Sequence, residues 1–346
     1  MLKLIEGFEG FGTVIGTGNN ITAVLAEKYG GHGSGPYYLD TGAFGGYSIY
    51  SNTTGTTQYM SFGTGTTSST LIFGFAFKIV SNSSGTIMWI FCGPGANLAL
   101  RIQWTSSGGE FLVYNEGEGN KHLGTTSGAG VTNGSGWHYV EFKILCHSSA
   151  GSVDVHVDGV SRLSVSGVNT ARDEYTYYSV INMHAMAQNR LDDIYIADDT
   201  GAINNDFLGR HSVVGLLPES DTATREWTPS SGTSHYDLID ENPSDDDTTY
   251  VSSNIAGYKD LYKFNQIDQG GVTAIQVNTI CRCPDTATDM KIDISSGGTL
   301  YPGSSQDVNF TTSYGTVQTV IETDPNTSAQ WTADGLNAAK IGFEVA

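Results

Sequence analysis

The sequence is poor in cysteine and in charged residues. Among 346 residues there are 4 Cys, and Asp, Glu, Lys and Arg together make up 15%. Four cysteines are too few for a disulfide-stabilised scaffold. Cys281 and Cys283 stand two apart in CRC, without the second CxxC pair that a zinc ribbon needs. We therefore expect all four cysteines to be reduced, small, buried residues.

Basic residues are scarcer still. Lys and Arg number 16 against 36 Asp and Glu, which gives a formal net charge of -20. Such a charge repels phosphate backbones and anionic lipid surfaces. Nucleic acid and membranes are therefore not expected as partners.

Long apolar runs are missing as well. The N-terminus, MLKLIEGFEGFG, lacks the basic segment and apolar core of a secretory signal. No later stretch approaches the roughly 18 apolar residues of a membrane-spanning helix. We expect a protein made without a secretory signal and without a membrane span.

The common catalytic motifs are also missing. The eight His residues are scattered, and none stands in a GxSxG or HExxH context. Each His is therefore expected to be a structural or solvent-facing residue.

Aromatic residues and turn formers are abundant. The chain has 18 Tyr, 14 Phe, 5 Trp and 44 Gly, so the aromatics supply apolar area for cores and the glycines belong to turns. Short alternating runs recur throughout residues 1–200, and none of them has a sustained helical period. The runs are 47–51, 58–63, 71–80, 86–93, 98–104, 110–115, 137–146, 153–157 and 191–198. This spacing predicts an all-β sandwich or jelly roll.

The hairpin at 137–159, WHYVEFKILCHSSAGSVDVHVDG, has one apolar and one polar face. His138, Val140, Phe142, Ile144 and Cys146 alternate on one strand, as do Val153, Val155 and Val157 on the next. If Cys146 faces Val153, Phe142 faces Val157, Lys143 lies opposite His156, and Glu141 lies opposite Asp158. The polar face, with Glu141, Lys143, Asp154, His156 and Asp158, is expected to contact solvent or a neighbouring subunit. A metal or acid-base site is the alternative.

The pattern changes after residue 200. Residues 201–255 are dense in turn formers and acids, with isolated aromatics, and are expected to form an ordered, irregular connector that wraps a domain. Residues 256–346 hold a second series of strands, at 260–267, 272–283, 290–297, 315–324 and 339–345, with one helical turn near Thr332. The sequence therefore predicts two β-sandwich domains, 1–200 and a smaller one at 256–346.

Acidic loops raise the question of calcium. Two groups could supply hard oxygen ligands: Asp245, Asp246 and Asp247, and Asp198, Asp199, Asn204, Asn205 and Asp206. Neither has the spacing of an EF-hand, and Asx-rich loops more often bond their own backbone. Calcium stays the alternative, and no metal or cofactor residue is assigned.

The order of the strands in residues 1–200 resembles the laminin G or concanavalin A-like jelly roll. A Trp-led strand, a hairpin ending in VDG and a closing LDDIYIAD strand carry the resemblance, through Trp137, Asp158, Gly159, Asp192 and Asp193. Such sandwiches include lectins, glycosidases and structural modules.

The glycosidases among these sandwiches carry closely spaced acids of the E-x-D-x-E kind, because retaining hydrolysis needs two carboxyls about 5 Å apart. This chain has no such triplet. Asp154, His156 and Asp158 lack a Glu, and the adjacent Asp192 and Asp193 are expected to point to opposite faces. We therefore expect no catalytic residues and no enzyme.

Nearly the whole chain is similar to a group of tailed-bacteriophage virion proteins. The N-terminal IEGFEGFG, the run DDIYIADDTGAINNDFLG, the segment from LLPESDTATREWTPSS to DDDTTYVSS, and TDPNTSAQWTADGLNAAKIGFEV carry the likeness. It implies a structural protein of the virion surface, assembled in the host bacterial cytoplasm. The expected roles are capsid decoration or a head fibre, with other virion proteins as partners and a homo-oligomer, a trimer being one form. The N-terminal segment is expected to dock on the shell or on a neighbouring subunit.

The alternative role is a tail or fibre module that recognises host surface glycans through aromatic stacking. The aromatics suspected for it are Tyr37, Tyr38, Trp104, Trp227 and Tyr236. A glycan hydrolase is the third hypothesis.

Overall fold

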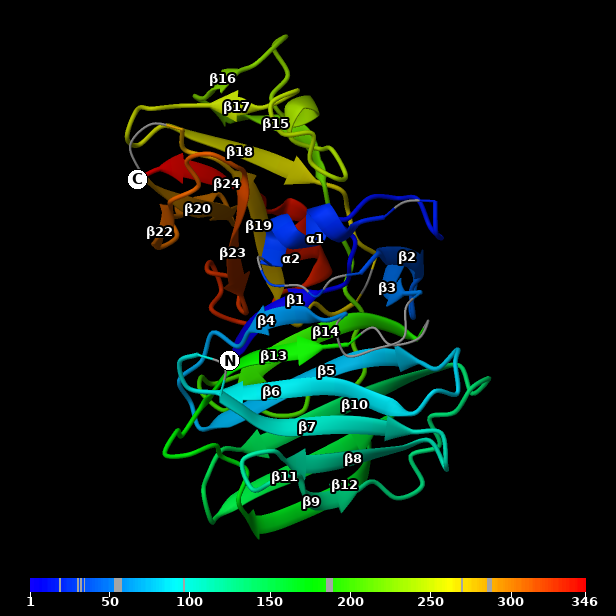
Figure 1. Ribbon diagram of the computed structural model, residues 1–346. Coiled ribbons are helices and arrows are strands. Elements are labelled where there is room, and N and C mark those ends of the chain that lie inside the picture. The colour runs from blue at the N-terminus through cyan, green and yellow to red at the C-terminus, as the bar shows by residue number, and fades with distance from the viewer. Residues whose placement is uncertain are drawn as a thin grey trace. The chain divides into compact units, whose positions relative to one another are not determined.

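The computed structural model describes residues 1–18, 20–29, 31, 33, 35–52, 58–95, 97–184, 189–268, 270–284 and 288–346. Strands dominate these residues, so the predicted all-β class is confirmed (Figure 1). The chain divides into two compact units, Met1–Val214 and Gly215–Ala346. No helix in the described ranges is long and apolar enough to cross a membrane.

In its described residues, unit 1 has two antiparallel sheets and one short helix, α1 (Thr22–Tyr29). The larger sheet runs in the order β12 (Val160–Val168), β11 (Gly151–Val157), β10 (Trp137–Leu145), β5 (Thr70–Lys78), β14 (Arg190–Asp198), β3 (Tyr47–Ser51) and β2 (Tyr37–Thr41), and β1 (Leu2–Glu6) pairs with β14. The smaller sheet runs β4 (Met60–Gly63), β13 (Tyr178–Met183), β6 (Gly85–Cys92), β7 (Asn97–Thr105), β8 (Glu110–Asn115) and β9 (Lys121–Thr125).

The core of unit 1 lies between these sheets. Phe73 and Phe142 of the larger sheet stack with ring centroids 5.0 Å apart, and Phe111 of the smaller sheet meets Phe142 edge-on at 6.2 Å. All three rings are at most 1% exposed, and burying each such side chain contributes about 1.5–3 kcal/mol. The aromatics counted in the sequence therefore join the two sheets into one sandwich.

The N-terminal segment, expected to dock on the shell or on a neighbouring subunit, packs on its own unit in this structure. Alternation along β1 buries Leu2 and Leu4, and β1 pairs antiparallel with β14. Phe8 and Phe11 follow into the core, at 0% and 1% exposed. Leu4, Phe8 and Phe11 of this segment therefore belong to the core of the sandwich.

The hairpin of β10 and β11 forms, but its predicted register is wrong. Ile144 pairs with Val153 and Phe142 with Val155, so Glu141 lies opposite His156 and Lys143 opposite Asp154. Cys146 has left this ladder, since its N–H donates to the carbonyl of Ser69. Because the shift is two residues, the apolar side chains still face the core.

The polar face of the hairpin, expected to contact solvent or a neighbouring subunit, is only partly open to solvent, because residues 199–214, here called the strap, cover part of it. Glu141 is 1% exposed and accepts hydrogen bonds from the Tyr195 hydroxyl at 2.6 Å and the Gly209 N–H at 2.8 Å. The His156 ring stacks on Phe207 with centroids 4.0 Å apart. The strap therefore covers the outer face of the sheet near β14, and the sandwich core covers the other face.

The central strands have sequences that suit this double burial. Strand β5, TLIFGFAFK, is buried at every position except Lys78, as is typical of strands covered on both faces. Gly74 leaves room for the ring of Tyr195, since a β-carbon there would lie 2.4 Å from it.

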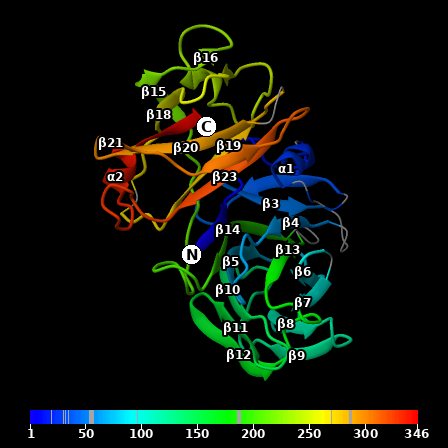
Figure 2. The same cartoon turned by 90° about the vertical axis from the view of Figure 1, so that its left-hand side faces the viewer.

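The described residues of unit 2 form one larger sheet and two small ribbons. The sheet runs β15 (Pro218–Arg225), β18 (Lys259–Phe264), β24 (Lys340–Val345), β20 (Thr288–Ser296) and β21 (Thr299–Tyr301), with β22 (Ser305–Val308) also pairing with β20. The ribbons are β16 (Thr228–Pro229) with β17 (Val251–Ser252), and β19 (Ile275–Cys281) with β23 (Gly315–Ile321), the latter side by side in Figure 2. The helical segments are η2 (Tyr236–Leu238) and α2 (Ala333–Ala338).

The core of unit 2 is smaller and combines the sheet with the β19–β23 ribbon. Ile292, Val317 and Trp331 belong to one buried cluster. The helical turn predicted near Thr332 is present as α2, and the Thr332 hydroxyl caps it by accepting from the Gly335 N–H at 3.0 Å.

The interval 201–255, expected as a connector, falls in both units. Residues 201–214 belong to the strap of unit 1, whereas β15, β16, η2 and β17 belong to unit 2. Strand β15 pairs with β18 and so extends the sheet of unit 2. Strand β15 was not predicted from the sequence, because PESDTATR has no apolar alternation and is rich in turn-forming residues.

Candidate functional site

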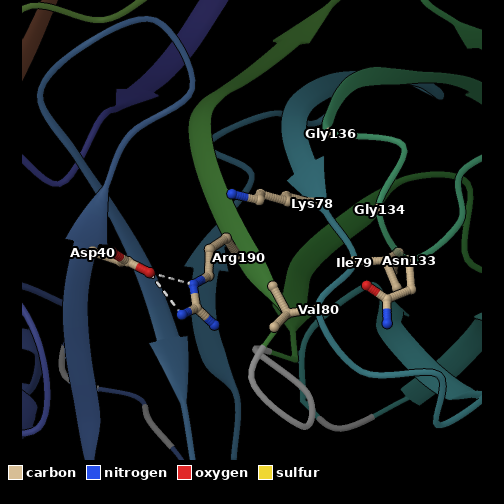
Figure 3. A pocket seen from close by; sticks show the side chains of 8 residues that line it. All are labelled: Asp40, Lys78, Ile79, Val80, Asn133, Gly134, Gly136 and Arg190. Carbon is tan, nitrogen blue, oxygen red and sulfur yellow. Dashed lines mark hydrogen bonds and ion pairs between the residues drawn. The ribbon is translucent and has the colours of Figure 1, made fainter.

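A cavity of about 490 Å³ opens on unit 1, at the end of the larger sheet. Strands β2, β5 and β14 contribute Asp40, Lys78 and Arg190, and the loops after β5 and before β10 supply the other walls. Figure 3 shows Arg190 directed at Asp40, with Asn133 on the opposite wall. The lining residues are Asp40, Lys78, Ile79, Val80, Asn133, Gly134, Gly136 and Arg190.

The pairing of the strands places five side chains in one row across this end of the sheet. Trp137 pairs with Lys78, and Lys78 pairs with Arg190. Leu191 pairs with Ile49, which sets Arg190 beside Tyr50, and Tyr50 pairs with Tyr38. Directly paired residues share a face, and the neighbours Phe77, Leu191 and Ile49 point into the core. The row Trp137, Lys78, Arg190, Tyr50 and Tyr38 therefore lies on the outer face.

Arg190 is fixed within this row. Its guanidinium lies 4.0 Å above the centre of the Tyr50 ring and contacts Asp40 at 2.6 and 2.7 Å. Partial burial alone would raise the pKa of Asp40, but the hydrogen bonds from Arg190 and the Thr41 N–H lower it below its usual value. Asp40 is thus a carboxylate that neutralises Arg190.

Lys78 is the second cation of the pocket. Its ammonium group lies 5.8 Å from the centre of the Trp137 ring. Among the residues that the structure describes, no acid forms an ion pair with it. Lys78 therefore brings a positive charge to the pocket that no carboxylate of the described residues contacts.

The loop before β10 forms a fixed wall. At its base, the Trp104 indole N–H donates to the Val131 carbonyl at 2.8 Å. Further on, the Ser135 hydroxyl contacts His138 Nε2 at 2.8 Å, and His138 Nδ1 contacts Asp158 at 2.7 Å. His138, expected to join the apolar face, thus holds the loop. These anchors leave Asn133 exposed on the pocket side.

Two glycines in the wall are required by their backbone. Gly134 and Gly136 have φ of 86° and 90°, a region that side chains strongly disfavour. No heavy atom lies within 4 Å of a β-carbon built at either position, so conformation rather than space selects glycine. The glycines of this loop shape the pocket wall.

Of the five aromatics suspected from the sequence, Tyr38 alone joins this row. Tyr37 and Trp104 are 0% and 1% exposed and belong to the core, so neither can stack on a ligand. Trp227 packs edge-on against Phe343 at 4.6 Å in unit 2, where Tyr236 begins η2.

The other members of the row were missed because the sequence does not reveal which strands are neighbours. Lys78 ends the apolar run LIFGFAFK, and Arg190 opens RLDDIYIAD. A cation at the tip of a buried strand was the available signal. Trp137 was recognised for the fold and not for the site.

The acids considered for calcium have protein partners. Asp198 contacts Lys3 at 3.1 Å and accepts from Thr66, Asp206 contacts Lys143 at 3.0 Å, and Asp247 contacts Arg282 at 2.7 Å. Within the described ranges, no group of three or more His, Cys, Asp or Glu residues is arranged to hold a metal ion.

Asp192 and Asp193 are both buried. The regular alternation that was expected to point them to opposite faces is interrupted here. A bulge interrupts the pairing of β14 at this point, and Asp193 has a φ of 47°. Asp192 accepts from the Ala43 N–H and Asp193 from the Val213 N–H, at 2.7 and 2.6 Å. These acids thus tie neighbouring loops to β14.

Comparison with known proteins gives likeness in structure only. No protein-family model matches the chain, and no curated protein matches it. An endo-β-1,4-glucuronan lyase from Trichoderma reesei is 12% identical, with a TM-score of 0.37 over 57% of this chain and 95% of that one. An alginate lyase is 11% identical, with a TM-score of 0.37 over 59% and 98%. Domain 4 of an extracellular arabinanase from Geobacillus stearothermophilus, solved with arabinotriose, is 13% identical, with a TM-score of 0.37 over 56% and 91%.

These likenesses correct one prediction. The expectation that the chain is not an enzyme is wrong as an inference from fold and motif, since two of the similar structures are polysaccharide lyases. At 11–13% identity they assign no activity to this chain either. The similar structures are sandwich domains that act on or bind carbohydrate, and the chain itself is a β-sandwich protein.

Proposed function

We propose that this protein binds a glycan in the pocket of unit 1. We also propose that it is displayed on the surface of a tailed-phage virion and that the glycan it binds is part of the host cell surface. The observation that carries the binding proposal is one cavity lined by Lys78, Arg190 and an exposed Asn133, with the aromatic side chains of the row on the strands beside it. Sugars present hydroxyl groups and apolar ring faces together, and such mixed sites suit them. The virion setting rests on the sequence likeness described above.

A glycan array probed with the whole protein tests the binding proposal, with titration calorimetry on any hit. The Asn133→Ala variant removes a polar group from the wall and should weaken binding severalfold. Trp227→Ala, an aromatic change in unit 2, is the matched control and should bind as the original protein does. An array without a hit on bacterial surface polysaccharides would refute the proposal.

The same incubations decide whether binding leads to cleavage. Size-exclusion chromatography of the polysaccharide before and after incubation measures its chain length. Shortened chains identify an enzyme, whereas unchanged chains identify a binding protein.

Cryo-electron microscopy of intact particles tests the virion setting. Regular copies on the shell support capsid decoration or a head fibre, and a few copies at the tail support host recognition. The proposed partners are other virion proteins and further copies of this chain, and the local symmetry at the attachment point gives the oligomeric state. Particles that lack the protein would refute the setting.

A further inference from the structure

We infer that the ligand of the pocket is an acidic saccharide, whose carboxylate or sulfate group pairs with Lys78. The inference rests on the proposed glycan binding and names its chemical class. It follows from the charges in the pocket, from the state of Lys78, and from the geometry of the row.

The pocket carries a positive charge in a strongly acidic protein. Its lining includes two cations and one acid, although the whole chain has a formal net charge of -20. Asp40 contacts Arg190 through two nitrogens at 2.6 and 2.7 Å and neutralises it. Lys78 is near enough to Asp40 to lower its pKa but makes no direct contact with a carboxylate of the described residues, so the lining keeps one net positive charge, which favours an anion over a neutral ligand.

Lys78 is partly withdrawn from water, which strengthens an ion pair made there. It is half-buried at the end of an otherwise buried strand, and Trp137 flanks it. An ion pair in such a setting is less screened than one on an open surface. A charged acceptor also makes stronger hydrogen bonds with the ammonium group than a neutral hydroxyl does.

The row provides for the sugar ring as well as for its charge. Its five strands are about 4.8 Å apart, so it spans roughly 19 Å, which suits a short oligosaccharide more than one ring. Trp137 and Tyr38 stand at its two ends, both half-buried, where ring faces can stack on them. Tyr50, at 6% exposed, lies beneath Arg190 and supports it.

The position of Lys78 fixes where the acid group lies along this row. Lys78 sits between Trp137 and Arg190, so the acid group lies one strand from the Trp137 ring. Asn133, on the opposite wall, is placed to bond a hydroxyl of the same ring. The ligand is thus an acidic sugar within a saccharide chain, bound by the ammonium group of Lys78, the ring of Trp137 and the amide of Asn133.

Calorimetry with three oligosaccharides of equal length tests this inference: one neutral, one of uronic acids and one sulfated. The full-length protein is compared with Lys78→Gln, with Lys78→Arg, and with Lys263→Gln, which removes the same charge from an exposed side chain of β18. Thermal melting establishes that each variant is folded.

We expect the protein to bind an acidic oligosaccharide at least about tenfold more tightly than the neutral one, because a charged hydrogen bond is worth about 1.5–3 kcal/mol. Lys78→Gln should remove most of this preference, Lys78→Arg should retain it, and Lys263→Gln should leave it unchanged. Whichever of the uronic and sulfated chains binds more tightly identifies the acid group.

Two results would overturn the inference in distinguishable ways. Binding of the neutral chain as tightly as the acidic chains, unaffected by Lys78→Gln, would refute the acidic class and leave glycan binding standing. No binding of any saccharide, neutral or acidic, would refute the proposed function itself.

Discussion

At the scale of single residues, two buried acids and one half-buried acid make the stability of unit 1 depend on pH. Burial is the main reason that the pKa of Asp192 rises to about 9, that of Glu9 to about 7 and that of Asp193 to about 6. The charge of Asp193 adds to the effect on Asp192. Each folded-state pKa lies above its unfolded value, so these acids stabilise the fold fully at low pH, and that stabilisation is lost as pH rises through the folded values.

Replacing Glu9 by Gln should flatten this dependence. The substituted amide would keep an acceptor for the Tyr47 N–H, which Glu9 holds at 3.1 Å, without a charge to desolvate. We expect the free energy of unfolding to fall less between pH 5 and pH 8 in the Glu9→Gln variant than in the original protein. Urea unfolding at both pH values measures this, and equal falls in the two proteins would contradict the role given to Glu9.

The carboxylate of Asp260 connects several segments of unit 2 through hydrogen bonds. It is 0% exposed and accepts hydrogen bonds from Glu226 N–H, Trp227 N–H, His235 Nδ1 and the Tyr262 hydroxyl, at 2.6, 2.9, 2.6 and 2.9 Å. An Asn at this position cannot accept all four. Asp260→Asn should destabilise unit 2 by about 3 kcal/mol, as measured by urea unfolding followed by Trp fluorescence. Asp268→Asn, at an exposed position, is the control, and equal stability of the two variants would refute the assignment.

At the scale of elements, the strap is the segment that sequence patterns could not place. Its residues have no apolar periodicity, and its contacts reach Glu141 and His156 in distant strands. Strands with clear apolar alternation were predictable, because alternation is local, whereas polar or short strands such as β12 and β15 were not. The hairpin register was not, because a shift of two residues preserves the same alternation.

Phe207 fastens the strap, and its removal should loosen it. The Phe207→Ala variant loses the stacking on His156, a contact of about 0.5–1.5 kcal/mol. We expect faster proteolysis within residues 199–214, mapped by mass spectrometry, with little change in overall melting. Val214→Ala, at a side chain 55% exposed, should be cut at the original rate. An unchanged rate in Phe207→Ala would show that other contacts hold the strap.

At the scale of the whole molecule, calcium can be tested directly. Three of the acids considered as ligands, Asp198, Asp206 and Asp247, already contact Lys3, Lys143 and Arg282, and binding calcium through them would require breaking these pairs. We therefore expect neither calcium nor a chelator to shift the melting temperature beyond the scatter of repeat scans. A rise with calcium that saturates would identify a site that the pairs do not prevent.

The sequence predicted the residue types of the candidate site but not how they are arranged. Composition indicated aromatics on a β-sandwich, and Tyr38 was among those named. Tyr38 lies beside Tyr50 on the next strand of the chain, whereas Lys78 lies beside Trp137 and Arg190 only because strands far apart in the chain pair. Periodicity determines which face a residue takes, whereas neighbours are decided by long-range packing.

The row across five strands also determines how this pocket can change during evolution. A one-residue insertion in β5 or β14 would turn Lys78 or Arg190 into the core and bring an apolar residue outward. These strands, which form the floor of the pocket, therefore tolerate substitutions but not insertions. The loop of residues 132–136 pairs with no strand and can vary in length and composition. Related proteins could therefore acquire new ligand preferences by exchanging that loop over an unchanged floor, and loop grafting would be the practical route to altering specificity.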